Sequence, residues 1–262
     1  MNIFKECLMK RSKLFGIIAL IAVIGLGACS SPSGGDGSGS TPPPTPKITM
    51  TTTVSGVTYI YLLGTGQATI NWGDGTTDVE DLNYSNDWND LRDNANRFSH
   101  TYSSGTKTLT VTGNITGFSS NGDGIASALN VTSCPGLIFL DFKENLTTLN
   151  LSKNTALEYL NFDGNQLTAL DLSKNTALKI LDCGYNDLAS LTITGCNALE
   201  KVYCNDNLLA DTPLATVLDN LPDRTTSLTQ GYIDVSGNYG ASGTIYTTAK
   251  TDAQGKNWDV DD

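Results

Sequence analysis

Hydrophobic residues recur at a fixed spacing through the middle of the chain. Seven consecutive segments follow the pattern Leu-x-x-Leu-x-hydrophobic-x-x-Asn/Cys, with valine in place of the second leucine in the last segment. Their hydrophobic positions are Leu137–Leu140–Phe142, Leu146–Leu149–Leu151, Leu157–Leu160–Phe162, Leu167–Leu170–Leu172, Leu178–Leu181–Cys183, Leu188–Leu191–Ile193 and Leu199–Val202–Cys204. Two segments make a coil of about 21 residues, which cannot bury its apolar edge alone and must stack on its neighbours. The pattern predicts a β-solenoid over residues 119–210, with Ala126–Leu129–Val131–Cys134 as a degenerate first half-repeat.

The last position of each segment predicts two ladders of turn residues, and the pattern as a whole resembles the leucine-rich repeat family. One ladder holds Asn145, Asn165, Asn186 and Asn207, and the other holds Cys134, Asn154, Asn175 and Cys196. Cys183 and Cys204 continue the inward column that Phe142 and Phe162 begin. We therefore expect these four cysteines to be buried structural thiols. A Cys183–Cys204 disulfide or a metal site is the alternative, although parallel Cβ vectors and the lack of a second ligand type disfavour both.

The two strand faces of this solenoid differ in their outward residues. One face is small and nearly repetitive, with Thr147, Thr148, Asn150, Thr168, Ala169, Asp171, Ala189, Ser190 and Thr192. The other presents Phe139, Asp141, Tyr159, Asn161, Ile180, Asp182, Lys201 and Tyr203, with Tyr185 and Asp206 at its rim. Aromatic rings beside carboxylates and amides suit a sugar or a protein partner. We predict ligand binding by Phe139, Tyr159, Asn161, Asp182, Tyr185 and Tyr203. Ordinary variation on a solvated sheet is the alternative, because Tyr and Phe are common strand residues.

Residues 47–118 alternate apolar and polar positions between Gly-rich turns, which predicts a small antiparallel β-sandwich. Asn71-Trp72-Gly73-Asp74-Gly75 and His100-Thr101-Tyr102 resemble the motifs of the PKD-like, immunoglobulin-type family. The long polar insert at residues 76–99 departs from that family and leaves the strand count open.

The tail at residues 211–262 is expected to close the solenoid as a small α/β cap. Thr212-Pro213 reads as the N-cap and first residue of a helix. Residues 231–235 and 258–260 read as strands, and residues 244–253 as a possible helix.

The start of the chain is predicted to be a lipoprotein signal peptide, residues 1–28. A basic segment precedes an apolar stretch that ends in Leu26-Gly27-Ala28-Cys29, which resembles the bacterial lipobox. The resemblance implies lipidation of Cys29 and, with Ser30 next to it, passage to the outer membrane. An ordinary secretory signal is the alternative. Residues 29–46 are rich in Gly, Ser and Pro and predict a flexible tether.

Charge and composition exclude several classes of function. Residues 1–28 hold four of the 16 basic and one of the 27 acidic residues, so the rest of the chain has 12 and 26 and a formal net charge of −14. Nucleic acid and anionic membrane surfaces should repel such a chain, and we expect contact with the membrane only through the lipid anchor.

Residues for catalysis are also scarce. The one histidine, His100, belongs to the PKD-like motif, and no Gly-rich phosphate loop is present. We therefore predict no enzyme activity, no cofactor and no metal, with calcium near Asp74 or residues 76–99 as an open alternative.

The order of lipobox, tether, PKD-like sandwich, repeats and cap resembles a family of surface lipoproteins from gut-type Gram-negative bacteria. The resemblance implies a non-enzymatic adhesive role. We expect a cell-surface, lipid-anchored monomer that recognises an extracellular glycan or protein. A structural accessory of an outer-membrane complex is the alternative.

Overall fold

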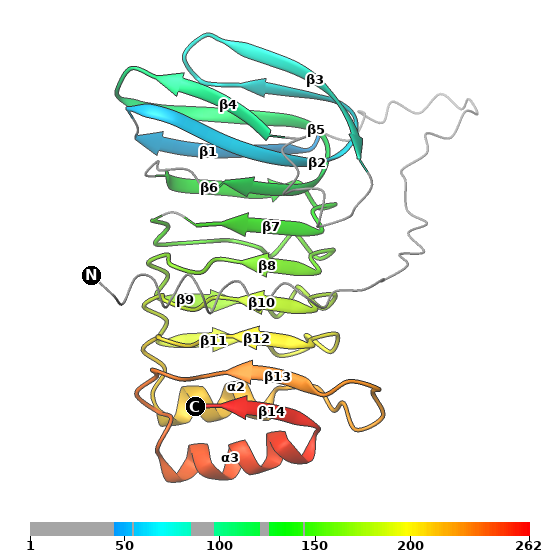
Figure 1. Cartoon of the computed structure of the whole chain (residues 1–262), viewed down its shortest axis with the longest axis vertical. Helices are drawn as coiled ribbons and strands as arrows, with labels where there is room; N and C mark the ends of the chain where they lie inside the picture. The colour runs from blue at the N-terminus through cyan, green and yellow to red at the C-terminus, as the bar shows by residue number, and fades with distance from the viewer. Residues whose placement is uncertain (1–44, 54, 85–96, 121–125, 144) are drawn as a thin grey trace, which may run out of the picture. The chain divides into compact units, whose positions relative to one another are not determined.

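The computed structural model describes residues 45–53, 55–84, 97–120, 126–143 and 145–262, and the fold of these residues is mainly β (Figure 1). The signal peptide, Cys29 and most of the tether lie outside the described residues, so these predictions remain predictions. The strands are β1 (Lys47–Thr53), β2 (Gly56–Asn71), β3 (Thr77–Tyr84), β4 (Arg97–Tyr102), β5 (Thr106–Ser120), β6 (Ala126–Ser133), β7 (Phe139–Phe142), β8 (Tyr159–Asn161), β9 (Ala169–Asp171), β10 (Ile180–Asp182), β11 (Ser190–Thr192), β12 (Lys201–Tyr203), β13 (Gly231–Asp234) and β14 (Trp258–Asp261). The helices are α2 (Asp211–Asp219) and α3 (Thr244–Gly255).

The repeats stack as successive coils, and the coils of β8 and β10 have a second strand, β9 and β11 respectively, on the opposite side (Figure 1). On the front face, the end of β5 and then β7, β8, β10, β12, β13 and β14 pair in parallel. The rear face holds β6, residues 147–150, β9 and β11, of which β9 and β11 pair in parallel. Leu140, Leu160, Leu181, Val202 and Ile233 are fully buried and occupy successive strands in register. The core of the stack is therefore a set of apolar columns between the two faces.

The strands that precede the coils form an antiparallel arrangement joined to the stack. β2 pairs with β3, β4 and β5, and β1 lies between β5 and β6. β5 contributes to both parts, because it also pairs with β7 through residues Gly117 to Ser120. The predicted domain boundary at residue 118 lies inside β5, so the hydrogen-bonded sheet is continuous across it. The division into domains remains a prediction.

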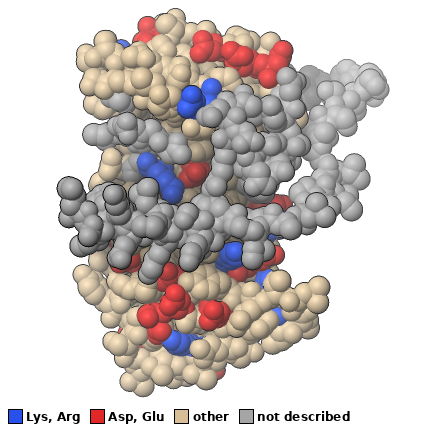
Figure 2. Space-filling view, viewed as in Figure 1, with Lys and Arg blue, Asp and Glu red and all other residues tan. Residues whose placement is uncertain are grey.

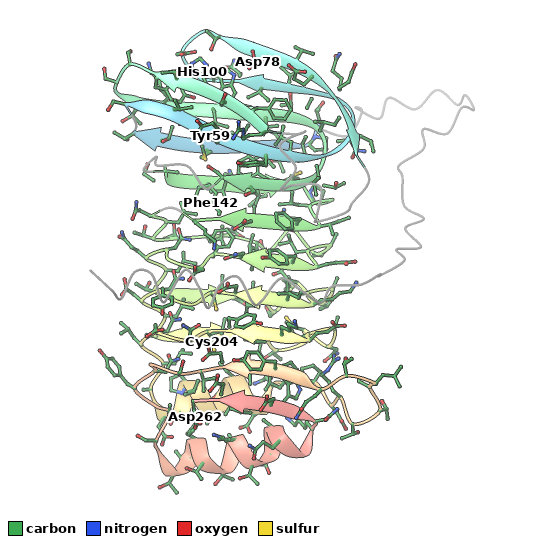
Figure 3. All side chains as sticks on the ribbon, in the orientation of Figure 1. Tyr59, Asp78, His100, Phe142, Cys204 and Asp262 are labelled. Carbon is green, nitrogen blue, oxygen red and sulfur yellow. The ribbon has the colours of Figure 1, made fainter. Side chains whose placement is uncertain are left out.

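The residues that carry the predicted PKD-like resemblance form one packed group. Trp72 is fully buried, and its indole N–H donates to Asp78 at 2.8 Å. The Tyr102 hydroxyl donates to the Trp72 carbonyl at 2.8 Å. The His100 ring stacks on Trp72 at 5.0 Å, and its Nε2 lies 2.7 Å from Asp74 Oδ2. Hydrogen bonds from Thr76 and then His100 hold the pKa of Asp74 well below its usual range. These contacts give His100 a structural role (Figure 3).

The polar insert contains a strand that its composition hides. Residues 77–84 form β3 and pair with β2 from Gly64 to Asn71. β3 is an edge strand that pairs only with β2 among the described strands. It carries Asp78, Glu80 and Asp81, and these charged residues hide the alternation of apolar and polar positions that would predict a strand. Residues 85–96 of the insert lie outside the described residues, and its last three residues begin β4.

The front ladder of turn residues holds Asn165, Asn186, Asn207 and Asn238. In each of these side chains the amide oxygen accepts a hydrogen bond and the amide nitrogen donates one. Asn186, for example, accepts from the Leu167 N–H at 3.0 Å and donates to the Phe162 and Cys183 carbonyls at 2.9 and 3.2 Å. The placement of Asn145 in this ladder is wrong, because Asn145 is exposed and accepts from Gln166 instead. Asn238 in the cap continues the ladder, accepting from the Leu209 N–H at 3.1 Å.

The rear ladder holds Cys134, Asn154, Asn175 and Cys196, all buried as predicted. In the two asparagines of this ladder only the amide nitrogen makes hydrogen bonds with described residues. Asn154 donates to the Val131 and Cys134 carbonyls at 2.9 and 2.8 Å, and its Oδ1 accepts nothing from the described residues. A thiol can replace such a side chain, because it still supplies a donor: Cys196 Sγ lies 3.3 Å from the Leu172 carbonyl. This difference explains why cysteine occurs in the rear ladder and only asparagine in the front one.

The inward cysteines are buried free thiols, which confirms the structural assignment over a disulfide. Cys183 and Cys204 are fully buried in the column that begins with the stacked rings of Phe142 and Phe162 (Figure 3). Burial raises the pKa of Cys204 to about 12 and that of Cys183 well above its usual value. Both thiols are therefore neutral and poorly nucleophilic in the folded protein.

The cap contains the predicted helices and strands, with one error at a helix start. Thr212 is not the N-cap of α2: the helix begins at Asp211 after Ala210, which makes no side-chain cap. Asp211 instead accepts from the Tyr246 N–H at 2.8 Å and so caps the first turn of α3. Neither described helix has the length and apolar character that a membrane span requires.

Candidate functional surface

Five of the six predicted ligand-binding residues occupy two rows of the front face, and the sixth, Tyr185, lies in the turn after β10. Strand register places Phe139, Tyr159, Ile180, Lys201 and Tyr232 in one row. The second row is Asp141, Asn161, Asp182, Tyr203 and Asp234. The rows are more sheltered than the rear face, where every predicted outward residue is exposed. Large side chains that pack on one another account for part of this shelter.

Phe139 is buried, although the alternation predicts that it points to solvent. Its exposed fraction is only 6%, because it packs beside Leu63 of β2 and stacks on Tyr159 with ring centroids 4.7 Å apart. Leu63 reaches this position over Gly117, where a Cβ atom would lie 2.8 Å from Leu63 Cδ1. Leu63 belongs to β2, which lies outside the repeats in the sequence. The repeat pattern therefore could not predict that Leu63 buries Phe139.

Asn161 is also buried, and it has a role in the turn. Its Oδ1 accepts from the Asp163 N–H at 3.0 Å, and its Nδ2 lies 3.5 Å from the Tyr159 hydroxyl. Asp182 and Asp234 occupy the same place and accept from Gly184 and Ser236. The same contact recurs on the rear face at Asn130, Asn150 and Asp171. Asx residues at this repeat position are a sequence signal for the turn.

The aromatic residues of the front face form two pairs. Phe139 and Tyr159 make the first, and Tyr203 and Tyr232 make the second with ring centroids 5.4 Å apart. Tyr232 is missing from the sequence-based set, because the repeat pattern stops before β13. Its strand nevertheless continues the register of β12, so the surface extends into the cap. The Tyr232 hydroxyl donates to Asp261 at 3.0 Å.

Asp182 lies between these two aromatic pairs, and its surroundings disfavour the ionised form of its carboxyl group. Burial, and then the Asp163 carboxylate, raises the pKa of Asp182 to about 6. The Gly184 N–H and Lys143 oppose that shift, and Asp141 adds to it. Lys143 is engaged with Asp163 at 3.5 Å. At neutral pH the front face therefore carries a partly desolvated carboxylate that a cationic group would stabilise.

Tyr185 has a strained backbone. The turns after β8, β10, β12 and β13 each contain a left-handed residue, and Gly164 and Gly237 fill this position with φ of 76° and 72°. Tyr185 and Asp206 occupy it with φ of 51°. A left-handed conformation costs a residue with a side chain about 1–2 kcal/mol, and a bulky ring is a rarer occupant than aspartate. The Tyr185 ring is 49% exposed, so this turn presents a ring at the rim of the face.

Carboxylates dominate the visible charge. Figure 2 shows them at the top of the view, where β3 lies, and over the lower coils, with fewer Lys and Arg. The described residues hold no group of three or more His, Cys, Asp or Glu side chains that could bind a metal ion. The front face offers aromatic rings in two pairs, one stacked and one tilted, and carboxylates on a parallel sheet, which suits recognition.

Comparison with solved structures gives several partial likenesses, two of them to surface proteins of Listeria monocytogenes. The chain is similar to the functional domain of InlJ from Listeria monocytogenes, which includes a cysteine ladder, with 30% identity over 43% of this chain and 23% of that one and a TM-score of 0.36. It is also similar to an internalin, InlF, from the same species, with 15% identity over 47% of this chain and 42% of that one and a TM-score of 0.32. The chain thus spans less than half of either structure. No family model and no curated protein matches.

Proposed function

We propose that this protein is a non-enzymatic recognition protein whose front face binds an extracellular protein. The observation that carries the proposal is the coil of β10. At two of its turn positions the chain uses residues that cost stability, Asp182 and Tyr185, where the preceding coil uses Asn161 and Gly164. Residues that strain a fold without serving it are concentrated at functional sites.

The chemistry of these residues favours a protein over a glycan. A desolvated carboxylate gains most from a cationic partner, and lysine or arginine side chains supply one. Tyr185 and Tyr203 add the aromatic contacts that are enriched in protein interfaces. Tyr159 and Tyr232 extend the same surface along its row. We further propose that lipidation of Cys29 and the tether at residues 29–46 display this face at the outer membrane.

The test is binding of the chain from Ser30 onward to a panel of extracellular matrix proteins and glycans. Asp182→Asn and Tyr185→Gly are compared with the wild type, and Thr192→Ser on the rear face is the matched control. We expect at least one protein to bind, with affinity reduced at least tenfold in either front-face variant and unchanged in the control. Binding to glycans alone would reassign the partner. A protein ligand bound equally by all variants would contradict the proposed site.

A further inference from the structure

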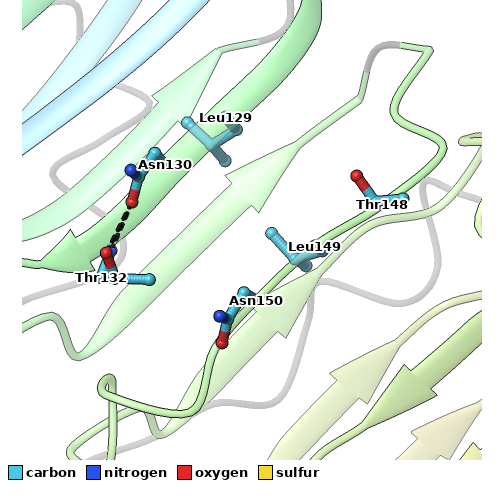
Figure 4. Close-up of a pocket in the computed structure, with 6 residues that line it drawn as sticks. All are labelled: Leu129, Asn130, Thr132, Thr148, Leu149 and Asn150. Carbon is cyan, nitrogen blue, oxygen red and sulfur yellow. Dashed lines mark hydrogen bonds between the residues drawn. The ribbon is translucent and has the colours of Figure 1, made fainter.

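The rear face contains a slot that the repeat pattern does not predict. A hollow of about 420 Å³ lies between β6 and residues 147–150 (Figure 4). It is lined by Leu129, Asn130, Thr132, Thr148, Leu149 and Asn150. From this slot we propose a second binding site, independent of the front face, that takes an uncharged extended peptide as an added β-strand.

Within the part of the chain that the structure describes, one wall of the slot is an open strand edge. β6 is the last strand in the order of the large sheet, and its strand partner is β1 on the opposite side. It is eight residues long and has neither a charged residue nor a proline. Natural proteins usually shorten, charge or cover such edges, because an open edge pairs readily with another chain.

The opposite wall also offers main-chain groups. Among the described residues, no main-chain hydrogen bond joins residues 147–150 to another main-chain group. Two coils further on, the same face is closed by the ladder between β9 and β11. The coils on either side of the slot remain tied at their turns, where Asn154 donates to the Val131 carbonyl at 2.9 Å. Relative to the β9–β11 ladder, the slot therefore lacks strand-to-strand hydrogen bonding among the described residues.

The side chains at the floor and rim of the slot indicate what kind of ligand fits it. Leu129 and Leu149 are less buried than Leu170 of the same column, so an apolar side chain could reach the core between them. The rim side chains Asn130, Thr132, Thr148 and Asn150 are amides and hydroxyls without charge. An extended peptide that alternates apolar and neutral polar residues matches both, since its side chains alternate between floor and solvent. The lining has no aromatic ring, which makes a sugar the weaker occupant.

The experiment measures amide hydrogen exchange in the chain from Ser30 onward, with a pool of blocked hexapeptides that alternate Val or Ile with Thr or Asn. We expect at least one peptide to slow exchange in β6 and residues 147–150 at least tenfold. Its N-methylated analogue, which keeps the side chains but loses main-chain donors, should bind at least tenfold more weakly. Maltohexaose serves as the neutral sugar probe.

Two lysine variants locate the site. Thr148→Lys places a charged side chain at the slot, as natural edge strands do, and should weaken the peptide at least tenfold. Ser190→Lys is the matched control on the closed ladder and should leave binding unchanged. The proposal is overturned if no hexapeptide slows exchange, if N-methylation or Thr148→Lys has no effect, or if maltohexaose alone protects these amides.

Discussion

The β8 and β10 coils share one backbone and differ in what their turns cost. After β8, Asn161 accepts the turn hydrogen bond without a charge, and Gly164 adopts the left-handed conformation freely. After β10, Asp182 makes the same hydrogen bond with a raised pKa, and Tyr185 holds the same backbone with a ring. The fold is therefore satisfied without the costly residues. Because the repeat does not require Asp182 and Tyr185, we attribute their presence in the β10 coil to the function of the front face.

The largest expected effect concerns the ladders that hold both coils in place. Asn186→Cys removes the acceptor for the Leu167 N–H and should lower the free energy of unfolding by about 2–4 kcal/mol. Asn175→Cys in the rear ladder keeps a donor and loses an idle Oδ1, so the loss should stay under about 1 kcal/mol. Urea denaturation of the two variants measures the difference. Equal losses would contradict the division of roles between the ladders.

Asp182→Asn should stabilise the protein in a pH-dependent way. Because the folded pKa of Asp182, about 6, lies above its value of 3.8 in the unfolded chain, the folded state binds more protons between these values. Wild-type stability from this group therefore falls as pH rises from 4 to 7. The variant keeps the acceptor for Gly184 and should gain about 1–3 kcal/mol at pH 8 and almost nothing at pH 4. A gain independent of pH would show that the carboxylate is not the cause.

Gly164→Tyr transfers the cost of the β10 turn to the β8 coil. A tyrosine at this left-handed position should lower the free energy of unfolding by about 1 kcal/mol. Thermal unfolding of this variant beside Gln166→Ser, an exposed substitution in the same turn, gives the comparison. An unchanged melting temperature would mean that the turn tolerates a ring without strain.

The smallest effect is expected at the inward thiols. Burial raises the pKa of Cys183 and Cys204, so both should resist a thiol reagent such as iodoacetamide at pH 8 until the protein unfolds. Mass spectrometry of native and urea-treated samples measures the modification. Rapid labelling of either residue in the native protein would contradict the packing of the column.

The sequence predicts the coils well because the apolar period alone decides which side chains point inward. Cys204 and Leu181, for example, are buried as their positions require. The front face is predicted less well. Phe139 is covered by Leu63, some 76 positions earlier in the chain, and no repeat pattern carries that contact. Asn161 and Asp182 were recognisable as turn residues, since Asx recurs at their position on both faces. The slot beside β6 depends on missing main-chain pairing, which side-chain patterns do not encode.

The most direct test of the account is the stability of the double variant Asp182→Asn with Tyr185→Gly. If Asp182 and Tyr185 both destabilise the fold, the free energy of unfolding of the double variant at pH 8 should exceed that of the wild type by about 1.5–4 kcal/mol. Urea denaturation measures it without knowledge of the ligand. A double variant no more stable than the wild type would show that these residues serve the fold, and the reason for placing the binding site at the β10 coil would be lost.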